Sequence, residues 1–173
     1  MIIKDKTKLK NKCKSVSVKD GLEIGNKLIK ELEETNGIGL AANQIGIDAS
    51  VCLIKVREPI ILINPEIIES SKEKFVFLEG CLSFPDKTVK TIRHKWVKVK
   101  SDNHKEVLKF SVNNDGSEKK EVLTDALETT CVQHEIDHLN GITMFDRQFK
   151  GTTLKRESKK IGRNDKVTIT KGT

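Results

Sequence analysis

The segment His134-Glu135-Ile136-Asp137-His138 places two imidazoles four residues apart, with a glutamate directly after the first of them. Residues at this spacing share one face of an α-helix, so His134 and His138 can bind the same metal ion. Glu135 then lies close enough to exchange a proton with a water molecule on that metal, as in metal-dependent hydrolases. The pattern therefore predicts hydrolysis assisted by a metal ion.

Two histidines leave such a site incomplete, because catalytic metal sites take three protein ligands and keep one position open. The metzincin pattern is followed as far as Gly141, but Met144 stands where the third histidine of that class would be. A thermolysin-like site would use a downstream glutamate, and the one available is Glu157, in a basic segment. Cys81 is the better candidate, because Gly80 lets the backbone turn after a predicted strand and because a metal-bound thiol loses its proton.

A third group of residues is the glycine-rich segment Gly37–Gln44. Its glycines permit a close approach of the backbone to a ligand. The segment lacks the preceding strand of a dinucleotide fingerprint and the lysine of a phosphate-binding loop. Gln44 offers an uncharged donor for a developing oxyanion, a role in which one hydrogen bond is worth about 3 to 4 kcal/mol.

The elements that must position these residues follow the order helix, strands, helix. Apolar residues at helical spacing predict a helix over Val18–Glu34 and another over Thr124–Asn140, which carries the histidine pair and ends at Gly141. Short β-branched and aromatic runs between the helices predict strands within 50–77, 89–100 and 107–112, and a short strand at Glu121–Leu123. The fold class is therefore α+β, with antiparallel or mixed β-sheets packed around a central helix that bears the HExxH motif. Thr124 is expected to cap that helix, and residues 113–116 are expected to form a turn.

Length and charge limit the remaining classes of protein. A chain of 173 residues predicts one compact domain, residues 1–150, followed by a basic tail, residues 151–173. No apolar run reaches the roughly 20 residues of a membrane-spanning helix, so we expect a cytoplasmic protein in which the four cysteines do not form a disulfide scaffold. The net charge of +7 favours contact with polyanions. Nucleic-acid binding as the main function is nevertheless disfavoured, because tyrosine is absent and the sequence contains no array of basic and aromatic residues.

Taken together, the three motifs resemble one family, the peptide deformylases. The Gly-x-Gly-Leu-Ala-Ala-x-Gln motif of the family matches Gly37–Gln44, its Glu-Gly-Cys-Leu-Ser motif matches Glu79–Ser83, and its Gln-His-Glu-x-Asp-His motif matches Gln133–His138. The resemblance covers about residues 8–145, and all three motifs match without substitution.

The resemblance implies a set of catalytic roles. Cys81, His134 and His138 would be the metal ligands, with water at the open position. Glu135 would be the general base that takes the proton of the water and passes it to the leaving amine. The side chain of Gln44 and the backbone N–H of Leu82 would hold the oxyanion when the water attacks the formyl carbonyl.

The resemblance also implies substrate contacts. The backbone of Ile38 and Gly39 would pair with an extended peptide. The side chains of Phe77, Leu127 and Cys131 would form the walls of a pocket for methionine. Glu79 and Gly80, from the cysteine motif, would lie next to the substrate. One position departs from the family, because Thr88 stands seven residues after Cys81, where many bacterial members have an arginine. Arg93 matches a second basic position of the same strand.

The expected cofactor is one divalent metal ion, Fe(II) by resemblance, with zinc, nickel or cobalt able to substitute. The expected substrates are N-formylmethionyl peptides and nascent chains, with contact to the ribosome, no membrane partner and a monomeric state. Two alternatives stay open. One is a small metallopeptidase that shares only the HExxH helix, and the other is an inactive, basic module that binds the ribosome or RNA.

Overall fold

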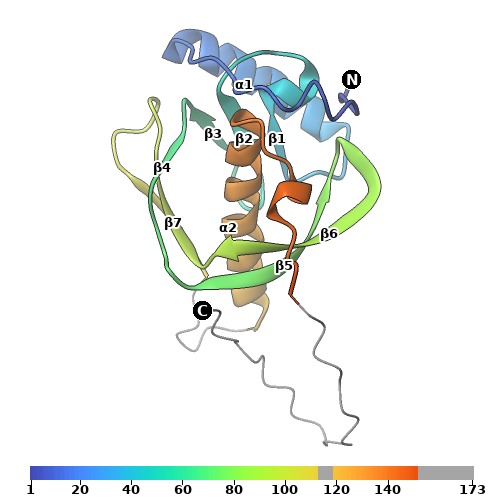
Figure 1. The fold of residues 1–173 in the computed structure, drawn as a ribbon. Helices are drawn as coiled ribbons and strands as arrows, with labels where there is room; N and C mark the ends of the chain where they lie inside the picture. The colour runs from blue at the N-terminus through green and yellow to red at the C-terminus, as the bar shows by residue number, and fades with distance from the viewer. Residues whose placement is uncertain (113–118, 152–173) are drawn as a thin grey trace, which may run out of the picture.

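The computed structural model describes residues 1–112 and 119–151. Their order of elements confirms the predicted α+β class, with strands between two α-helices (Figure 1). The elements, in which η denotes a 3-10 helix, are α1 Val18–Glu33, β1 Gly39–Ala41, η1 Ala42–Ile45, β2 Val51–Ile54, β3 Ile60–Ile63, β4 Glu66–Ser70, β5 Lys74–Cys81, β6 Phe84–His94, β7 Trp96–Lys100, β8 Leu108–Ser111, α2 Lys119–Leu139 and η2 Met144–Arg147.

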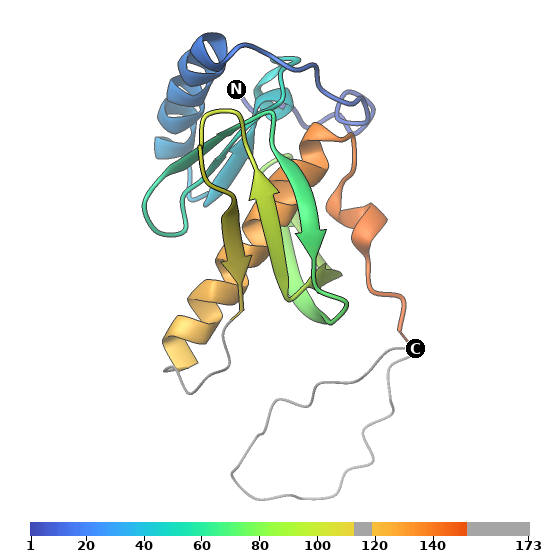
Figure 2. The ribbon, with the colours of Figure 1, turned by 90° about the vertical axis from the view of Figure 1, so that its left-hand side faces the viewer.

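The strands form three antiparallel groups in the part of the chain that the structure describes: β1-β2-β3, β4-β7-β8 and β5-β6. Helix α2 runs through the middle of the molecule, and β4-β7-β8 lies in front of it in Figure 2. One core cluster joins α1 to the first sheet, and a second joins α2 to the first and second sheets. All four residues of β2 are buried, which explains why Val51–Ile54 is continuously apolar and does not alternate.

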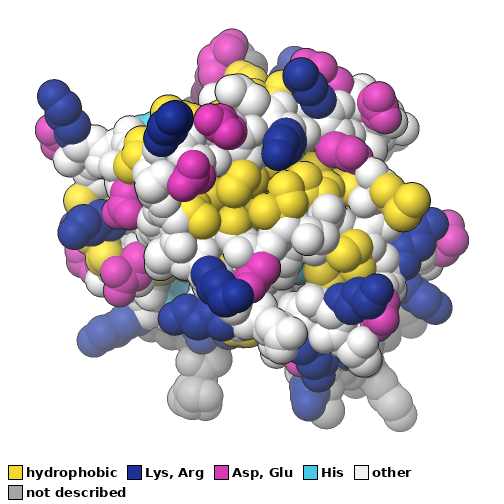
Figure 3. Space-filling model, turned by 90° about the horizontal axis from the view of Figure 1, so that it is seen from above, with side chains coloured by type: hydrophobic (Ala, Val, Ile, Leu, Met, Phe, Trp, Pro, Cys, Tyr) yellow, Lys and Arg dark blue, Asp and Glu magenta, His cyan; other side chains and the backbone are white. Residues whose placement is uncertain are grey.

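Helix α1 confirms the predicted helix at the start of the chain. Ser17 caps it, because its hydroxyl accepts a hydrogen bond from the backbone N–H of Asp20 at 3.1 Å and donates one to the carboxylate of Asp20 at 2.7 Å. Leu28 and Leu32 are buried on its inner face. The exposed end of the molecule over α1 carries a band of hydrophobic side chains bordered by charges of both signs (Figure 3), and α1 itself exposes Val18 and Leu22.

Helix α2 is longer than the sequence pattern indicates. The predicted strand at Glu121–Leu123 is wrong, because these residues belong to α2. Thr124 is not the N-cap, since it lies inside the helix and its hydroxyl donates to the carbonyl of Lys120 at 2.9 Å. The predicted helix end is confirmed by Gly141, whose φ is 73° and at which a Cβ would lie 2.2 Å from the carbonyl oxygen of Lys10.

From Thr129 to Leu139 every residue of α2 is buried. Polar side chains on a buried helix need hydrogen-bond partners inside the protein. This requirement determines many contacts of the site described below. Neither described helix combines the length and the apolar character that crossing a bilayer requires. The predicted turn at residues 113–116 and the basic tail, except for Gly151, lie outside the described residues.

Candidate active site

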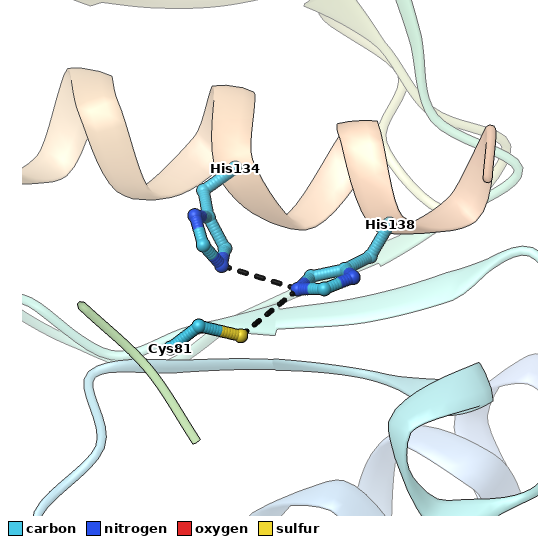
Figure 4. A group of neighbouring side chains, drawn as sticks. All are labelled: Cys81, His134 and His138. Atoms are coloured by element: carbon cyan, nitrogen blue, oxygen red, sulfur yellow. Dashed lines mark hydrogen bonds between the residues drawn. The ribbon is translucent and has the colours of Figure 1, made fainter. Parts of the chain in front are cut away.

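The three residues proposed as metal ligands meet at one point (Figure 4). The Nε2 atoms of His134 and His138 lie 3.1 Å apart, and the Sγ of Cys81 lies 3.3 Å from Nε2 of His138. All three candidate ligand atoms lie within 4.8 Å of one another. His134 and His138 are buried and Cys81 is half-buried, so the group has one side toward solvent.

These residues fit a metal ion. Ligand bonds of about 2.0 to 2.3 Å in a tetrahedral arrangement place the ligand atoms about 3.3 to 3.6 Å apart. The observed separations of 3.1 and 3.3 Å are close to that spacing. A thiolate with two imidazoles is also a donor set that divalent transition metals accept.

Cys81 reaches the histidines because the β5-β6 hairpin is irregular at this point. Gly80 pairs with Thr88, but Cys81 pairs with Phe84, so residues 85–87 have no partner on β5. Irregularities of this kind bend a strand and redirect a side chain. The sequence analysis inferred a backbone turn at Gly80, and the structure has the break in register between Gly80 and Cys81.

The ring of His134 is oriented by a carboxylate. Its Nδ1 atom lies 2.7 Å from Oε2 of Glu79. A carboxylate accepts a proton at this position, which places the hydrogen on Nδ1 and leaves the lone pair of Nε2 directed at the other ligands. Nδ1 of His138 is buried and has no partner among the described residues.

Behind Glu79 lies a buried chain of alternating charges. Arg93 donates to both carboxylate oxygens of Glu79, at 2.6 and 2.9 Å, and to Asp137 at 2.5 Å. Arg147 donates to Asp137 from outside at 2.7 and 3.0 Å. Burial alone would raise the pKa of Glu79, but the hydrogen bonds and charges of Arg93 and His134 outweigh it and lower that pKa to about 2. The guanidinium of Arg93 is therefore bound to the carboxylates of Glu79 and Asp137, and it is not free to bind a substrate.

Replacing Arg93 by Met should lower the free energy of unfolding by about 3 to 5 kcal/mol, because it leaves the carboxylates of Glu79 and Asp137 buried with one cation fewer. Chemical denaturation of the purified variant measures the change. The control is Lys14→Met, which breaks the exposed ion pair with Asp48 and should leave the free energy of unfolding nearly unchanged. Equal costs for the two variants would show that the buried chain adds nothing to the fold.

Glu135 lies beside the proposed ligands. Its side chain is buried, and one carboxylate oxygen, Oε2, has no partner among the described residues. Burial raises the pKa of Glu135 to about 7. A carboxylate with this pKa can both take up and release a proton near neutral pH, which suits a general base that later acts as a general acid.

Gln44 has a defined orientation at the site. Its Oε1 accepts from the backbone N–H of Ala41 at 2.9 Å, so its Nε2 donors point the other way. Nε2 lies 3.1 Å from the hydroxyl of Ser83 and 3.5 Å from the Sγ of Cys81. The side chain thus presents N–H donors directly beside the proposed ligand group.

A pocket of about 670 Å³ opens over these residues. Helix α2, strands β1 and β5 and the β5-β6 turn line it. The structure places all seven proposed substrate-contact residues in its lining: Ile38, Gly39, Phe77, Glu79, Gly80, Leu127 and Cys131. Gln44, Leu82 and Glu135 line it as well. The carboxylate of Glu79 is bound by Arg93, His134 and the hydroxyl of Thr91, so its oxygens are engaged within the protein although the residue lines the pocket.

Gly39 is in close contact with the reactive end of the pocket. A Cβ at this residue would lie 2.6 Å from the Sγ of Cys131 and 2.6 Å from Oε1 of Glu135. Gly39→Ala should therefore cost about 1 to 3 kcal/mol of stability through overpacking and should reduce activity by displacing Glu135. Gly80→Ala is the matched control in thermal unfolding, because a Cβ there meets nothing within 4 Å. If both alanine variants unfold at the same temperature, the close approach at Gly39 is not required.

Several supporting residues are not among the site residues predicted from the sequence. Asn43 donates to the backbone carbonyl of His138 at 2.7 Å, and Gln133 joins α2 to both backbone groups of His94 at 3.0 Å. Ser83, Asn43 and Gln133 lie inside the matched motifs, so that signal was present. Arg93 matches a basic position of the family, but its bonds to Glu79 and Asp137 have no local signal, because they depend on β6 crossing α2. Glu157, the other candidate for the third ligand, lies outside the described residues.

A thiol and two imidazoles that meet at one point, beside a buried glutamate and an open pocket, define the site of a metal-dependent hydrolase. Residues 1–156 match the family model described as "Polypeptide deformylase". The chain belongs to this family.

Individual relatives agree with this assignment. A peptide deformylase from Natranaerobius thermophilus is 40% identical over 143 residues, which are 80% of this chain and 85% of the relative. One from Bartonella tribocorum is 36% identical over 132 residues, with 72% and 68% of the two chains covered. Among solved structures, the peptide deformylase from Thermotoga maritima superposes with a TM-score of 0.67 at 33% identity, covering 82% of this chain and 91% of its own. A probable peptide deformylase from Synechococcus phage S-SSM7 superposes with a TM-score of 0.70 at 31% identity, covering 85% and 98%.

Proposed function

We propose that this chain hydrolyses the N-formyl group from the N-terminal formylmethionine of newly made polypeptides. The observation that carries the proposal is the meeting of Cys81, His134 and His138 beside Glu135, at the end of an open pocket. Membership of the deformylase family supports the reaction.

The residues divide the reaction among them. Cys81, His134 and His138 would hold a divalent cation, which would supply polarisation of water and a lower pKa of that water. Glu135 takes a proton from the attacking water and delivers it to the leaving amine, so that the formyl C–N bond breaks and formate and a free amino terminus result. Nε2 of Gln44 and the backbone N–H of Leu82 donate to the carbonyl oxygen while it carries negative charge.

The pocket supports recognition of a formylated methionine. Phe77, Leu127 and Cys131 supply apolar walls for the methionine side chain, and the backbone of Ile38 and Gly39 pairs with the extended peptide. The formyl carbon carries only a hydrogen beside its carbonyl and nitrogen. A close-fitting cavity over that carbon therefore excludes acetyl and larger groups by contact.

The finer assignments belong to the same proposal. The metal in the cell is Fe(II), for which zinc, nickel or cobalt can substitute at a site with one thiolate and two imidazoles. The enzyme acts in the cytoplasm as a monomer, on nascent chains at the ribosome. Residues 1–150 form its catalytic domain, and the basic residues 151–173 form a separate tail.

The test is formate release from a formyl-Met tripeptide by protein purified and loaded with Fe(II) without oxygen. We expect rapid release from the formyl peptide, no release of acetate from the acetylated analogue, and loss of activity with a chelator. Cleavage of internal peptide bonds without formate release would instead identify a metallopeptidase. Fully metal-loaded, folded protein that releases no formate would contradict the proposal.

A further inference from the structure

The outer face of the β4-β7-β8 sheet, which faces the viewer in Figure 2, has an unusual composition. Val97 and Val99 of β7 are buried against the core that contains α2, so the alternate residues Trp96, Lys98 and Lys100 point outward. Lys98 pairs directly with Lys109 of β8 across the strands. The face therefore combines the one tryptophan of the chain with three lysines from two strands.

The two paired lysines converge on the aromatic ring. Nζ of Lys98 lies 5.8 Å and Nζ of Lys109 lies 5.7 Å from the centre of the Trp96 ring. These are cation–π contacts, and they hold two ammonium groups at one half-exposed indole. Like charges directly opposite each other across a strand pair are unfavourable by themselves. An anion bound between the two ammonium groups would remove that cost.

Acidic residues neutralise only part of this face. Glu69 of β4 pairs with Lys98 at 2.5 Å, and Glu66 lies opposite Lys100 in the strand register. Within residues 1–112 and 119–151, Lys109 makes no ion pair. By contrast, the face over α1 that Figure 3 shows has acidic and basic side chains interleaved around a hydrophobic band, which does not favour a polyanion. The positive charge is thus greatest on the β7-β8 side of the sheet, next to Trp96.

We propose that the outer face of β7 and β8 binds single-stranded RNA, with a base stacked on Trp96 and phosphates bound by Lys98, Lys100 and Lys109. An aromatic ring beside lysines binds an unpaired base by stacking and its phosphates by charge, and it does so without sequence specificity. The choice of RNA rests on the proposed function, because nascent chains are made on a particle with exposed RNA. The sequence analysis found no array of basic and aromatic residues because Lys109 is brought to Trp96 only by strand pairing.

The test is titration of the full chain with an unlabelled RNA 12-mer of uridines, followed by the fluorescence of Trp96, the one tryptophan present. Stacking should quench that fluorescence, and the affinity should fall as salt concentration rises. Fluorescence anisotropy of a labelled 12-mer measures binding to variants. Trp96→Leu should weaken binding by about tenfold, and Lys98→Gln/Lys109→Gln should weaken it and reduce the salt dependence by about 0.7 per lost phosphate contact.

The matched control is Lys27→Gln/Lys30→Gln, which removes two exposed charges from α1 and should leave RNA affinity within about twofold. All variants should keep formate release, since none of these side chains lines the pocket. Absence of quenching, equal weakening by the α1 control, or equally tight binding of a double-stranded 12-mer would overturn the proposal. These readouts do not depend on catalysis, so failure of RNA binding and failure of the deformylase assay can be told apart.

Discussion

Replacing Glu135 by Gln is expected to reduce formate release by about 10²- to 10⁴-fold while leaving metal content unchanged. The amide has the same shape as the carboxylate but cannot take up a proton from water. Glu135 contributes none of the three ligand atoms that meet at the candidate metal site, so its replacement leaves those ligands in position. Turnover of a formyl-Met peptide and metal analysis of the same preparation measure the two quantities.

Glu128→Gln provides the matched control for this variant. Glu128 lies on the same helix and makes an ion pair with Arg57 at 2.5 Å, but it does not line the pocket. Its substitution should leave formate release within about twofold, since the ion pair with Arg57 lies outside the pocket. If Glu135→Gln retains full activity, Glu135 is not the base, and a different proton acceptor must be sought.

The fold was predictable where local pattern and burial agree. The helical spacing over Val18–Glu34 and Gly141 after α2 are sequence signals with direct counterparts in the structure. The start of α2 was not predictable in the same way. Val122 and Leu123 have the apolar character of a short strand. They lie one helical turn before Ala126 and Leu127, however, and belong to the same helix, whose second half is buried in the core.

The residue types of the candidate site could be predicted from the sequence. Most of the hydrogen bonds and ion pairs that join them could not. Two histidines at helical spacing indicate a metal directly from the sequence. The third ligand comes from a strand over 50 residues away, and only the irregular pairing of β5 with β6 brings Cys81 into reach. Arg93 shows the limit most clearly, because nothing near it in the sequence indicates that its guanidinium joins Glu79 to Asp137.

The sulfur of Cys81 is the ligand whose loss should have the largest effect on metal binding. Cys81→Ser replaces a thiolate by a neutral hydroxyl, which is a weak ligand for divalent transition metals because it keeps its proton near neutral pH. Loss of an outer-shell partner alone costs about 10- to 100-fold in affinity, so loss of the ligand itself should cost about 100-fold or more. Activity should fall with metal occupancy.

Co(II) gives a readout that does not depend on catalysis. A thiolate ligand produces a charge-transfer absorption with this ion, and that absorption should be present in the parent chain and absent in Cys81→Ser. Cys13→Ser is the control, because Cys13 is buried in the core and burial raises its thiol pKa to about 11, which disfavours the thiolate. Its cobalt spectrum should match that of the parent.

Absence of the charge-transfer absorption in the parent chain, together with unchanged metal affinity in Cys81→Ser, would show that a different group completes the site, and Glu157→Gln would then be the variant to examine. The geometry argues against that outcome. The Sγ of Cys81 already lies 3.3 Å from Nε2 of His138, and the amide of Gln44 lies 3.5 Å from the same sulfur. A metal bound to the two histidines would therefore contact this sulfur, and the oxyanion donor would lie next to the carbonyl that is attacked.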